Sequence, residues 1–193
     1  MKTILLIENG SRHTLAFANR LKQYDVRHIK YRNLTSGHID AADIVILSGG
    51  HPSVLHHSWF YKRQLELIRT TTKPIIGVCL GFELIVRAYG GRLYRLKRKS
   101  HGLRTIAVTA DALALGVSNL RVWEAHKWAA RSVPAKTFSV IAESVNGAEI
   151  IQHRTKPIYG CQFHPEVVDP SNDGSKVLEA ILRMIESEAV PGC

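Results

Sequence analysis

Ile75-Ile-Gly-Val-Cys79-Leu-Gly-Phe-Glu-Leu84 joins a short apolar run to a cysteine flanked by glycines. The apolar run up to Val78 predicts a buried strand, and the residues from Leu80 to Gly90-Gly91 predict a helix. Glycines two residues before and after Cys79 permit a sharp turn from strand to helix, which pushes the intervening side chain outward. The stretch therefore predicts a nucleophile elbow with Cys79 at its tip.

The predicted helix would direct backbone N–H groups at the same point as the thiol. These donors and the helix dipole favour a thiolate and stabilise an oxyanion, and the N–H of Leu80 is the expected donor. The alternative interpretation is a buried structural cysteine, with the glycines serving close helix packing. Because a cysteine nucleophile needs a base, the ten histidines of the chain decide between the two.

His164 has the most informative surroundings of these histidines. The stretch Gly160-Cys-Gln-Phe-His164-Pro-Glu166 places it at the carboxyl end of a predicted strand, where open α/β sheets hold their sites. Residues two apart in extended chain project to the same side, so Glu166 is expected to hold the imidazole in one tautomer. His13 and His56-His57 lie in polar, loop-like stretches and are expected to face solvent.

The rest of the chain predicts an α/β fold in one domain over residues 1–193. Strands and helices alternate up to Gly91, which predicts an open, mostly parallel sheet with helices on both faces. After Gly91, short strands with little helix between them predict antiparallel additions to the same sheet. The expected strands are 3–7, 26–31, 43–47, 74–78, 104–109, 120–124, 137–143, 149–153 and 158–163, and the expected helices are 15–24, 59–70, 80–90 and 175–188.

The composition excludes several classes of protein. No apolar run approaches the ~20 residues of a membrane span, so a membrane protein is not expected. Three scattered cysteines, Cys79, Cys161 and Cys193, suit neither a disulfide framework nor a zinc motif, which favours a reducing cytoplasm. No metal or cofactor is expected.

The chain is basic, with a formal net charge of +10 and a pI of about 9.8. Much of this charge gathers in one stretch, and no aromatic platform with RNA-binding spacing accompanies it, which argues against nucleic acid. The stretch is interpreted as a solvated face or as a surface for a partner protein or an anionic ligand. Its basic residues are Arg92, Arg95, Lys97, Arg98, Lys99 and Arg104.

Three motifs together resemble the class I glutamine amidotransferases, with the amidotransferase component of GMP synthase the nearest in look. They are Ser48-Gly49-Gly50, Gly77-Val-Cys79-Leu-Gly81 and Gln162-Phe-His164-Pro-Glu166, in that order along nearly the whole chain. The resemblance implies a flavodoxin-like sheet, glutamine as substrate and a separate synthetase that accepts the ammonia. It also implies a γ-glutamyl thioester at Cys79, with His164 as base and Glu166 as its partner.

The resemblance also implies roles for residues around the nucleophile. The glycine loop with Gly49 and Gly50 would supply an oxyanion donor from Gly50, opposite the N–H of Leu80. The stretch Val122-Trp-Glu-Ala-His126-Lys-Trp128 resembles the family segment whose main chain holds the amino-acid end of glutamine. By position, Lys127 and Trp128 are assigned to this role.

One residue departs from the family pattern. Glu83 stands where the family has glutamine, one helical turn from Cys79, so its side chain is expected to reach the pocket. A carboxylate there accepts hydrogen bonds but donates none, and Glu83→Gln is expected to improve the use of glutamine. Cys79-Leu-Gly-Phe-Glu83 resembles the γ-glutamyl hydrolases, so a stand-alone γ-glutamyl hydrolase or peptidase is the second hypothesis. A catalytically silent relative is the third.

Overall fold

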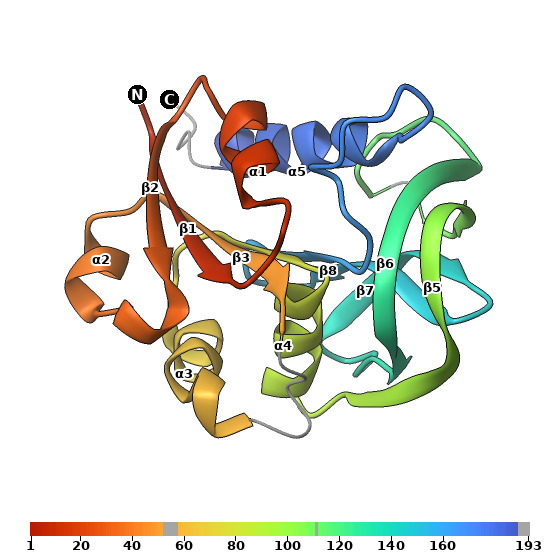
Figure 1. Ribbon diagram of the computed structural model, residues 1–193, viewed down its shortest axis with the longest axis horizontal. Helices are drawn as coiled ribbons and strands as arrows, with labels where there is room; N and C mark the ends of the chain where they lie inside the picture. Colours follow the sequence, from red (N-terminus) through yellow and green to blue (C-terminus); the bar gives the residue numbers. More distant parts are fainter. Residues whose placement is uncertain (52–57, 111, 189–193) are drawn as a thin grey trace.

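The computed structural model describes residues 1–51, 58–110 and 112–188 (Figure 1). Its strands are β1 (Thr3–Asn9), β2 (Asp25–Lys30), β3 (Ile44–Gly50), β4 (Ile75–Val78), β5 (Arg92–Val108), β6 (Asn119–Ser132), β7 (Phe138–Ser144), β8 (Gly147–His153) and β9 (Ile158–Cys161). Its α-helices are α1 (Thr14–Arg20), α2 (Ser36–Asp40), α3 (Lys62–Thr70), α4 (Leu80–Ala88) and α5 (Gly174–Glu188), and two short 3-10 helices span Tyr31–Asn33 and Ser58–Tyr61.

One nine-stranded sheet runs through the molecule in the order β2-β1-β3-β4-β9-β8-β6-β5-β7, with a further pairing of β8 with β7. The strands from β2 to β9 in this order pair in parallel. The strands from β9 onward pair antiparallel. The predicted α/β fold and its antiparallel additions are thus confirmed, whereas parallel pairing is confined to one half of the sheet.

The antiparallel half differs from the prediction in the length of its first two strands. β5 and β6 extend over 17 and 14 residues, where the sequence predicts only 104–109 and 120–124. The basic stretch was not predicted as a strand because its charged residues lack an alternating pattern. It forms one because the residues on both sides of a break in register, Arg92 to Arg95 and Ser100 to Ala107, pair with β6.

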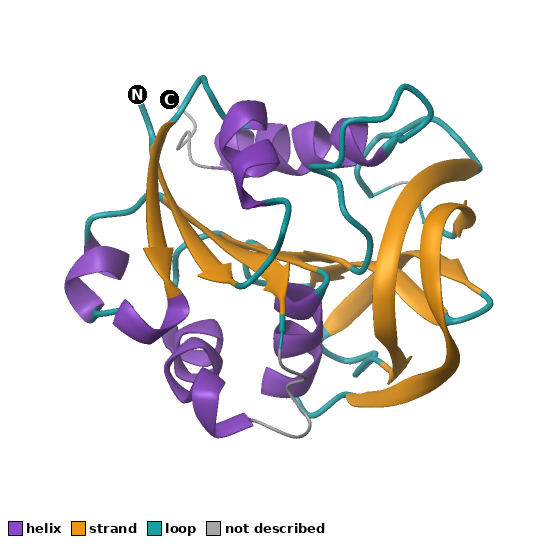
Figure 2. Cartoon of the chain, viewed as in Figure 1, coloured by secondary structure: helices purple, strands orange, loops and turns teal. Residues whose placement is uncertain are grey.

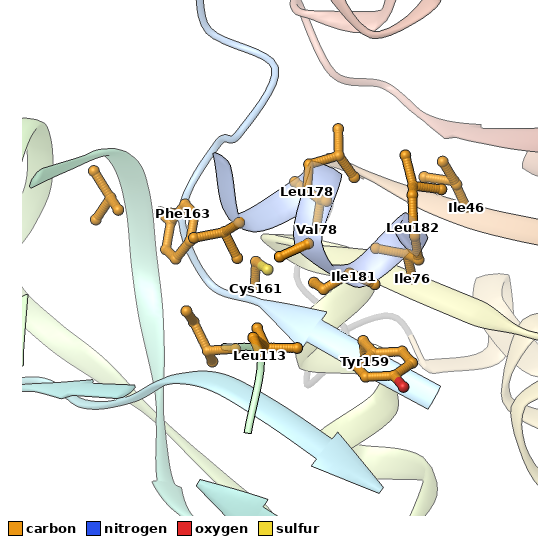
Figure 3. Close-up of a cluster of buried hydrophobic side chains, with 14 of the residues drawn as sticks. Ile46, Ile76, Val78, Leu113, Tyr159, Cys161, Phe163, Leu178, Ile181 and Leu182 are labelled. Carbon is orange, nitrogen blue, oxygen red and sulfur yellow. The ribbon is translucent and has the colours of Figure 1, made fainter. Parts of the chain in front are cut away.

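Helices cover the sheet from both sides (Figure 2). Alternate residues of β1 explain this, since Ile4 and Leu6 belong to one buried cluster and Leu5 and Ile7 to another. The first cluster includes residues of α5 that pack on the central strands (Figure 3). The second includes residues of α3 and α4.

Helix α4 positions the elbow because it is buried on almost every side. All its residues except Arg87 are buried, so the helix that follows Cys79 is fixed between the sheet and its neighbours.

No helix within the described ranges is long and apolar enough to span a bilayer.

Candidate active site

Cys79 sits at a strained corner between β4 and α4. Its backbone angles, φ 51° and ψ −102°, lie in a positive-φ region that residues other than glycine rarely adopt. Close packing holds the corner in place, because a Cβ atom on Gly77 would lie 2.6 Å from the backbone of Gly81. A Cβ atom on Gly81 would in turn collide with the carbonyl oxygen of Leu47. The glycines therefore serve the tight contact of strand and helix, and the turn has the geometry expected of a nucleophile elbow.

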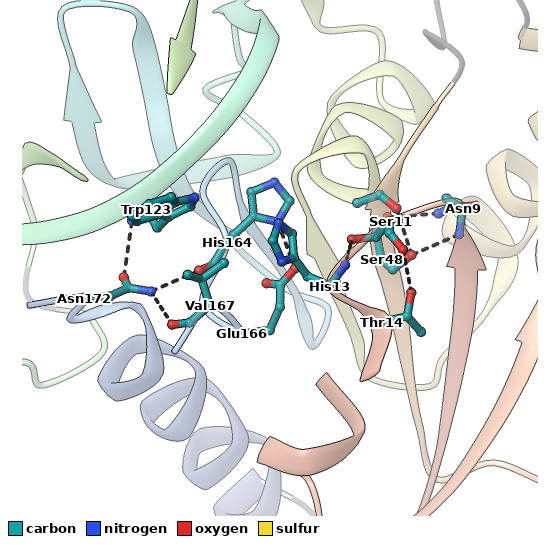
Figure 4. Close-up of polar contacts among 11 residues, drawn as sticks. Asn9, Ser11, His13, Thr14, Ser48, Trp123, His164, Glu166, Val167 and Asn172 are labelled. Atoms are coloured by element: carbon teal, nitrogen blue, oxygen red, sulfur yellow. Dashed lines mark hydrogen bonds and ion pairs between the residues drawn. The ribbon is translucent and has the colours of Figure 1, made fainter. Parts of the chain in front are cut away.

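His164 and Glu166 lie in the turn after β9 and form a buried pair (Figure 4). The Nδ1 atom of His164 is 2.8 Å from Oε1 of Glu166, and the two side chains are 5% and 0% exposed. Since the carboxylate accepts, Nδ1 carries the hydrogen, and Nε2 is the ring nitrogen left for Cys79. The arrangement is that of a base held by an orienting carboxylate.

The turn that carries His164 is fixed from two sides. The backbone N–H of His164 donates to the carbonyl oxygen of Trp123 on β6, at 2.8 Å. The side-chain amide of Asn172 donates to the carbonyl oxygens of His164 and Val167, at 3.2 and 2.9 Å (Figure 4). These bonds fix the main chain from which the imidazole of His164 projects.

The thiol and the imidazole are electrostatically coupled. Burial on its own would lower the pKa of His164, but the negative charge of the Cys79 thiolate, a hydrogen bond to it and the pair with Glu166 raise that pKa to about 10. The imidazolium form of His164 is therefore favoured at neutral pH. A positive charge beside the sulfur is the setting in which cysteine nucleophiles react.

The glycine loop at the end of β3 lies against both groups. A Cβ atom on Gly49 would stand 2.9 Å from Cε1 of His164 and 3.4 Å from Cβ of Cys79, so only glycine fits there without displacing the imidazole. Asn9 fixes the loop: its backbone N–H donates to Oγ of Ser48 at 2.9 Å, and its amide donates to the carbonyl oxygen of Ser48 at 3.0 Å.

A pocket of about 330 Å³ opens beside Cys79 and His164. Its wall is rich in cationic and imidazole side chains, and none of the described residues that line it carries a carboxylate. Such a wall favours a substrate with a negative charge. The lining residues are Gly10, Ser11, Arg12, His13, Gly50, His51, Cys79, Lys99, His101, Trp123, Ala125 and His164.

His13 is the pocket residue that the sequence placed wrongly. It was expected to face solvent, but it lies in the turn after β1 and its ring centroid is 5.2 Å from that of His164. Burial and the neighbouring His164 lower the pKa of His13, which favours its neutral form. Its position after a parallel strand, on the edge that holds Cys79 and His164, was the available signal. His56 and His57 lie outside the described residues.

The residues expected to bind substrate are only partly at the pocket. Leu80 is the first residue of α4, so its N–H has no acceptor within the helix, although its buried side chain does not line the pocket. Trp123 and Ala125 line the wall where Lys127 and Trp128 were expected. Lys127 instead directs Nζ to the carbonyl oxygen of Lys97, at 3.3 Å.

Glu83 is not found at the pocket wall either. Its side chain is 4% exposed and is not among the residues that line the pocket. Burial raises the pKa of Glu83 to about 8, an effect opposed by the nearby His126 and Gln162. Glu83 thus belongs to a polar cluster in the interior, and its carboxyl is largely protonated at neutral pH.

Comparisons with known proteins identify the family of this chain. A family model described as "Glutamine amidotransferase class-I" matches residues 5–184. The chain is 31% identical over 183 residues to a glutamine-hydrolysing GMP synthase subunit from Methanocaldococcus jannaschii, covering 91% of this chain and 94% of that protein. It is 29% identical over 200 residues to the GMP synthase of Thermosipho melanesiensis, covering 96% of this chain but only 36% of that longer protein.

A solved structure from Thermoplasma acidophilum, described as a GMP synthase subunit, superposes with a TM-score of 0.87 at 25% identity and covers 97% of this chain and 96% of its own. A glutamine amidotransferase from Thermotoga maritima superposes with a TM-score of 0.73 at 18% identity, over 98% of this chain and 86% of its own, and shows the shared fold. The match of the family model over nearly all of the described chain establishes that this protein belongs to the class I glutamine amidotransferases.

Proposed function

We propose that this protein is a glutamine amidotransferase that hydrolyses the side-chain amide of glutamine and supplies ammonia to a partner synthetase of the GMP synthase kind. The observation that carries the proposal is the Cys79–His164–Glu166 arrangement at the open pocket, in a chain of this family. Residues 1–193 would act as one domain with a flavodoxin-like parallel half. Its free thiols suit the cytoplasm.

In the proposed reaction, the Cys79 thiol proton is held on Nε2 of His164 before glutamine is attacked. The thiolate attacks the amide carbon, and the oxyanion of the tetrahedral intermediate accepts hydrogen bonds from the N–H groups of Leu80 and Gly50. His164 then gives its proton to the departing nitrogen, the C–N bond breaks, and ammonia leaves. Water attacks the γ-glutamyl thioester with His164 as base, which releases glutamate and restores the thiol.

The charge of the pocket supports an amino-acid substrate. Arg12, in the turn after β1, and Lys99, on β5, both line the wall. Their positive charges suit the α-carboxylate of glutamine. The main chain of β6 at Trp123 and Ala125 would hold the amino-acid end, in place of Lys127 and Trp128. Gly49 would leave room for the amide beside the thiolate.

The basic stretch of β5 is the proposed docking surface for the synthetase. Arg92, Arg95, Lys97, Arg98 and Lys99 are all exposed on this strand. The relative from M. jannaschii is named as one subunit of GMP synthase and matches over 94% of its length, which supports assigning the use of ammonia to a partner. An acidic surface on the synthetase would complement this strand.

The test is to incubate the purified protein with glutamine or with γ-glutamyl peptides, with and without cell extract, and to measure ammonia and glutamate. Glutamine hydrolysis that increases with extract is the expected result. Turnover of γ-glutamyl peptides by the isolated chain, with glutamine left intact, would instead favour the γ-glutamyl hydrolase. Cys79→Ser is expected to abolish turnover, and a variant that retained it would exclude Cys79 as the nucleophile.

A further inference from the structure

A second cluster of acid and imidazole groups lies inside the antiparallel half of the sheet, away from the pocket. Glu124 and His126 of β6 and Glu149 of β8 are 1%, 2% and 1% exposed. One oxygen or nitrogen atom from each lies within 4.8 Å of the others. Because residues alternate along a strand, β6 turns these two side chains inward while Trp123 and Ala125 face the pocket.

The hydrogen bonds of the cluster leave it open at its centre. Nδ1 of His126 lies 2.8 Å from the carbonyl oxygen of Trp128, which can only accept, so Nδ1 carries a hydrogen. Nε2 then faces Oε2 of Glu124 at 3.2 Å. In the neutral ring this places a lone pair against a carboxylate, so either a proton or a metal ion must stand between Nε2 and Oε2.

Two carboxylate oxygens of the cluster have no partner. Oε1 of Glu149 accepts the hydroxyl hydrogen of Ser144 at 2.7 Å, but its Oε2 is buried and bonds to no described residue. Oε1 of Glu124 is likewise buried and makes no hydrogen bond of normal length to the described residues, although the nearby hydroxyl of Ser100 acts on this carboxyl group. A buried oxygen without a hydrogen bond costs about 1–3 kcal/mol, and more when charged.

The charge of the cluster is also uncompensated by lysine or arginine. Among the ion pairs of the described residues, the only one that includes Glu124 is with His126, and none includes Glu149. The guanidinium of Arg104 acts on Glu124 from a distance and donates to the carbonyl oxygen of Leu103. With His126 protonated and both carboxylates ionised, the cluster keeps a net negative charge, which a bound cation would neutralise.

We infer that Glu124, His126 and Glu149 bind a divalent transition-metal ion, with Zn²⁺ the best match. One imidazole nitrogen and two carboxylate oxygens form a donor set found at zinc sites. Each of two ligands also has the outer hydrogen bond typical of such sites, His126 to a backbone carbonyl and Glu149 to Ser144.

The ion would have a mechanical role. β6 and β8 pair only at Ala130 with Ala148 in the described sheet, so little main-chain bonding holds these strands together. A metal ion shared by Glu124, His126 and Glu149 would tie them and fix the strand whose other face forms the pocket wall. The inference goes beyond the proposed function and does not require it.

The test uses the full chain with Cys79→Ser, which removes the active-site thiolate as a competing zinc ligand. The protein is expressed with added Zn²⁺ or Mn²⁺ and purified without chelator. Its bound metal is measured by mass spectrometry, and its thermal unfolding is followed before and after depletion with a chelator. Glu149→Gln removes one ligand charge at nearly constant volume, and Glu143→Gln makes the same change at an exposed position on the neighbouring strand β7.

About one equivalent of Zn²⁺ is expected in Cys79→Ser and in its Glu143→Gln form, with a Tm about 5 °C or more above that of the depleted protein. In the Cys79→Ser background, Glu149→Gln is expected to lose both the bound metal and the metal-dependent increase in Tm. It is still expected to be more stable than metal-depleted Cys79→Ser, because one of two facing carboxylates becomes neutral. Ser144→Ala is expected to weaken binding about 10-fold or more while the chain still folds. Protein without bound metal, or equal metal content in Glu149→Gln and Glu143→Gln, would overturn the inference.

Discussion

The protein contains two buried histidine–glutamate pairs whose members are two residues apart, and they are built differently. At the pocket, Nδ1 of His164 donates to Oε1 of Glu166 at 2.8 Å, which leaves Nε2 to interact with Cys79. In the interior, Nε2 of His126 faces Oε2 of Glu124 at 3.2 Å, while Nδ1 donates to the backbone carbonyl of Trp128. Which ring nitrogen faces the carboxylate therefore decides whether the other nitrogen is available to a group in the pocket.

The local backbone explains this difference. Glu124 and His126 project from one face of a regular strand, where neighbours at i and i+2 lie side by side. His164 and Glu166 flank Pro165 in a turn after β9, so the imidazole can contact its carboxylate and still face the elbow. A motif of the same spacing thus gives a base in one place and an internal polar cluster in the other.

The largest expected effect comes from the same change made in each pair. Glu166→Gln is expected to lower kcat for glutamine by about 10²–10⁴-fold, because the imidazole loses its fixed tautomer and its charge partner. Glu124→Gln is expected to change kcat by less than about 10-fold, because Glu124 does not line the pocket. Steady-state ammonia release measures both, and equal losses in the two variants would show that the pairs do not act separately.

The second expected effect is on the pH dependence of stability. The pKa of His164 is raised to about 10, above its unfolded value of 6.5, so its stabilising contribution is complete below pH 6.5 and is lost as pH rises through 10. His164→Gln is therefore expected to destabilise the protein more at pH 6 than at pH 10.5. Urea unfolding at the two pH values measures this, and a difference that grows with pH would contradict the coupling to Cys79.

A smaller effect is expected from the strain at the elbow, which the interior pair lacks. Cys79→Gly is expected to be more stable than Cys79→Ala by about 1 kcal/mol, because glycine tolerates a φ of 51°. The control is Cys161 of β9, whose φ is not positive. There Cys161→Gly is expected to be less stable than Cys161→Ala, and the same sign at both positions in urea unfolding would refute strain at Cys79.

The smallest effect is expected from Glu83, which belongs to the interior cluster. Glu83→Gln is expected to change KM for glutamine by less than about threefold at pH 7, since the side chain does not line the pocket and its raised pKa leaves it largely neutral. This replaces the improvement expected from the sequence. A large gain for glutamine would place Glu83 at the substrate and strengthen the γ-glutamyl hydrolase hypothesis.

The sequence predicted what depends on local patterns. Cys79 was recognised from its flanking glycines and His164 from the carboxylate two residues later, and both signals are short-range. Lys127 and Trp128 were assigned by position alone, and the register of β6 instead brings Trp123 and Ala125 to the wall.

Contacts between distant segments could not be predicted in this way. The position of His13 after a predicted strand indicated the edge of the sheet on which it lies, but not that β1 lies beside β3, which brings His13 to the pocket. Glu149 meets His126 only because β8 is placed between β9 and β6. Buried acids in separate strands carry no common motif, so the interior cluster was visible only in the folded chain.

The length of β5 gives it a further consequence. One continuous backbone runs from the basic Arg92 end to Lys99 and His101 at the pocket, and its register against β6 breaks between Arg95 and Ser100. A synthetase that binds the basic end of β5 could shift the segment between Arg95 and Ser100, which is not paired with β6, and with it Lys99 and His101 at the pocket. We expect docking of the synthetase to change the rate of glutamine hydrolysis even if the synthetase contacts no pocket residue. An Arg95→Ala variant that still binds the synthetase, and whose glutamine hydrolysis is still stimulated in full, would show that β5 does not couple docking to the pocket.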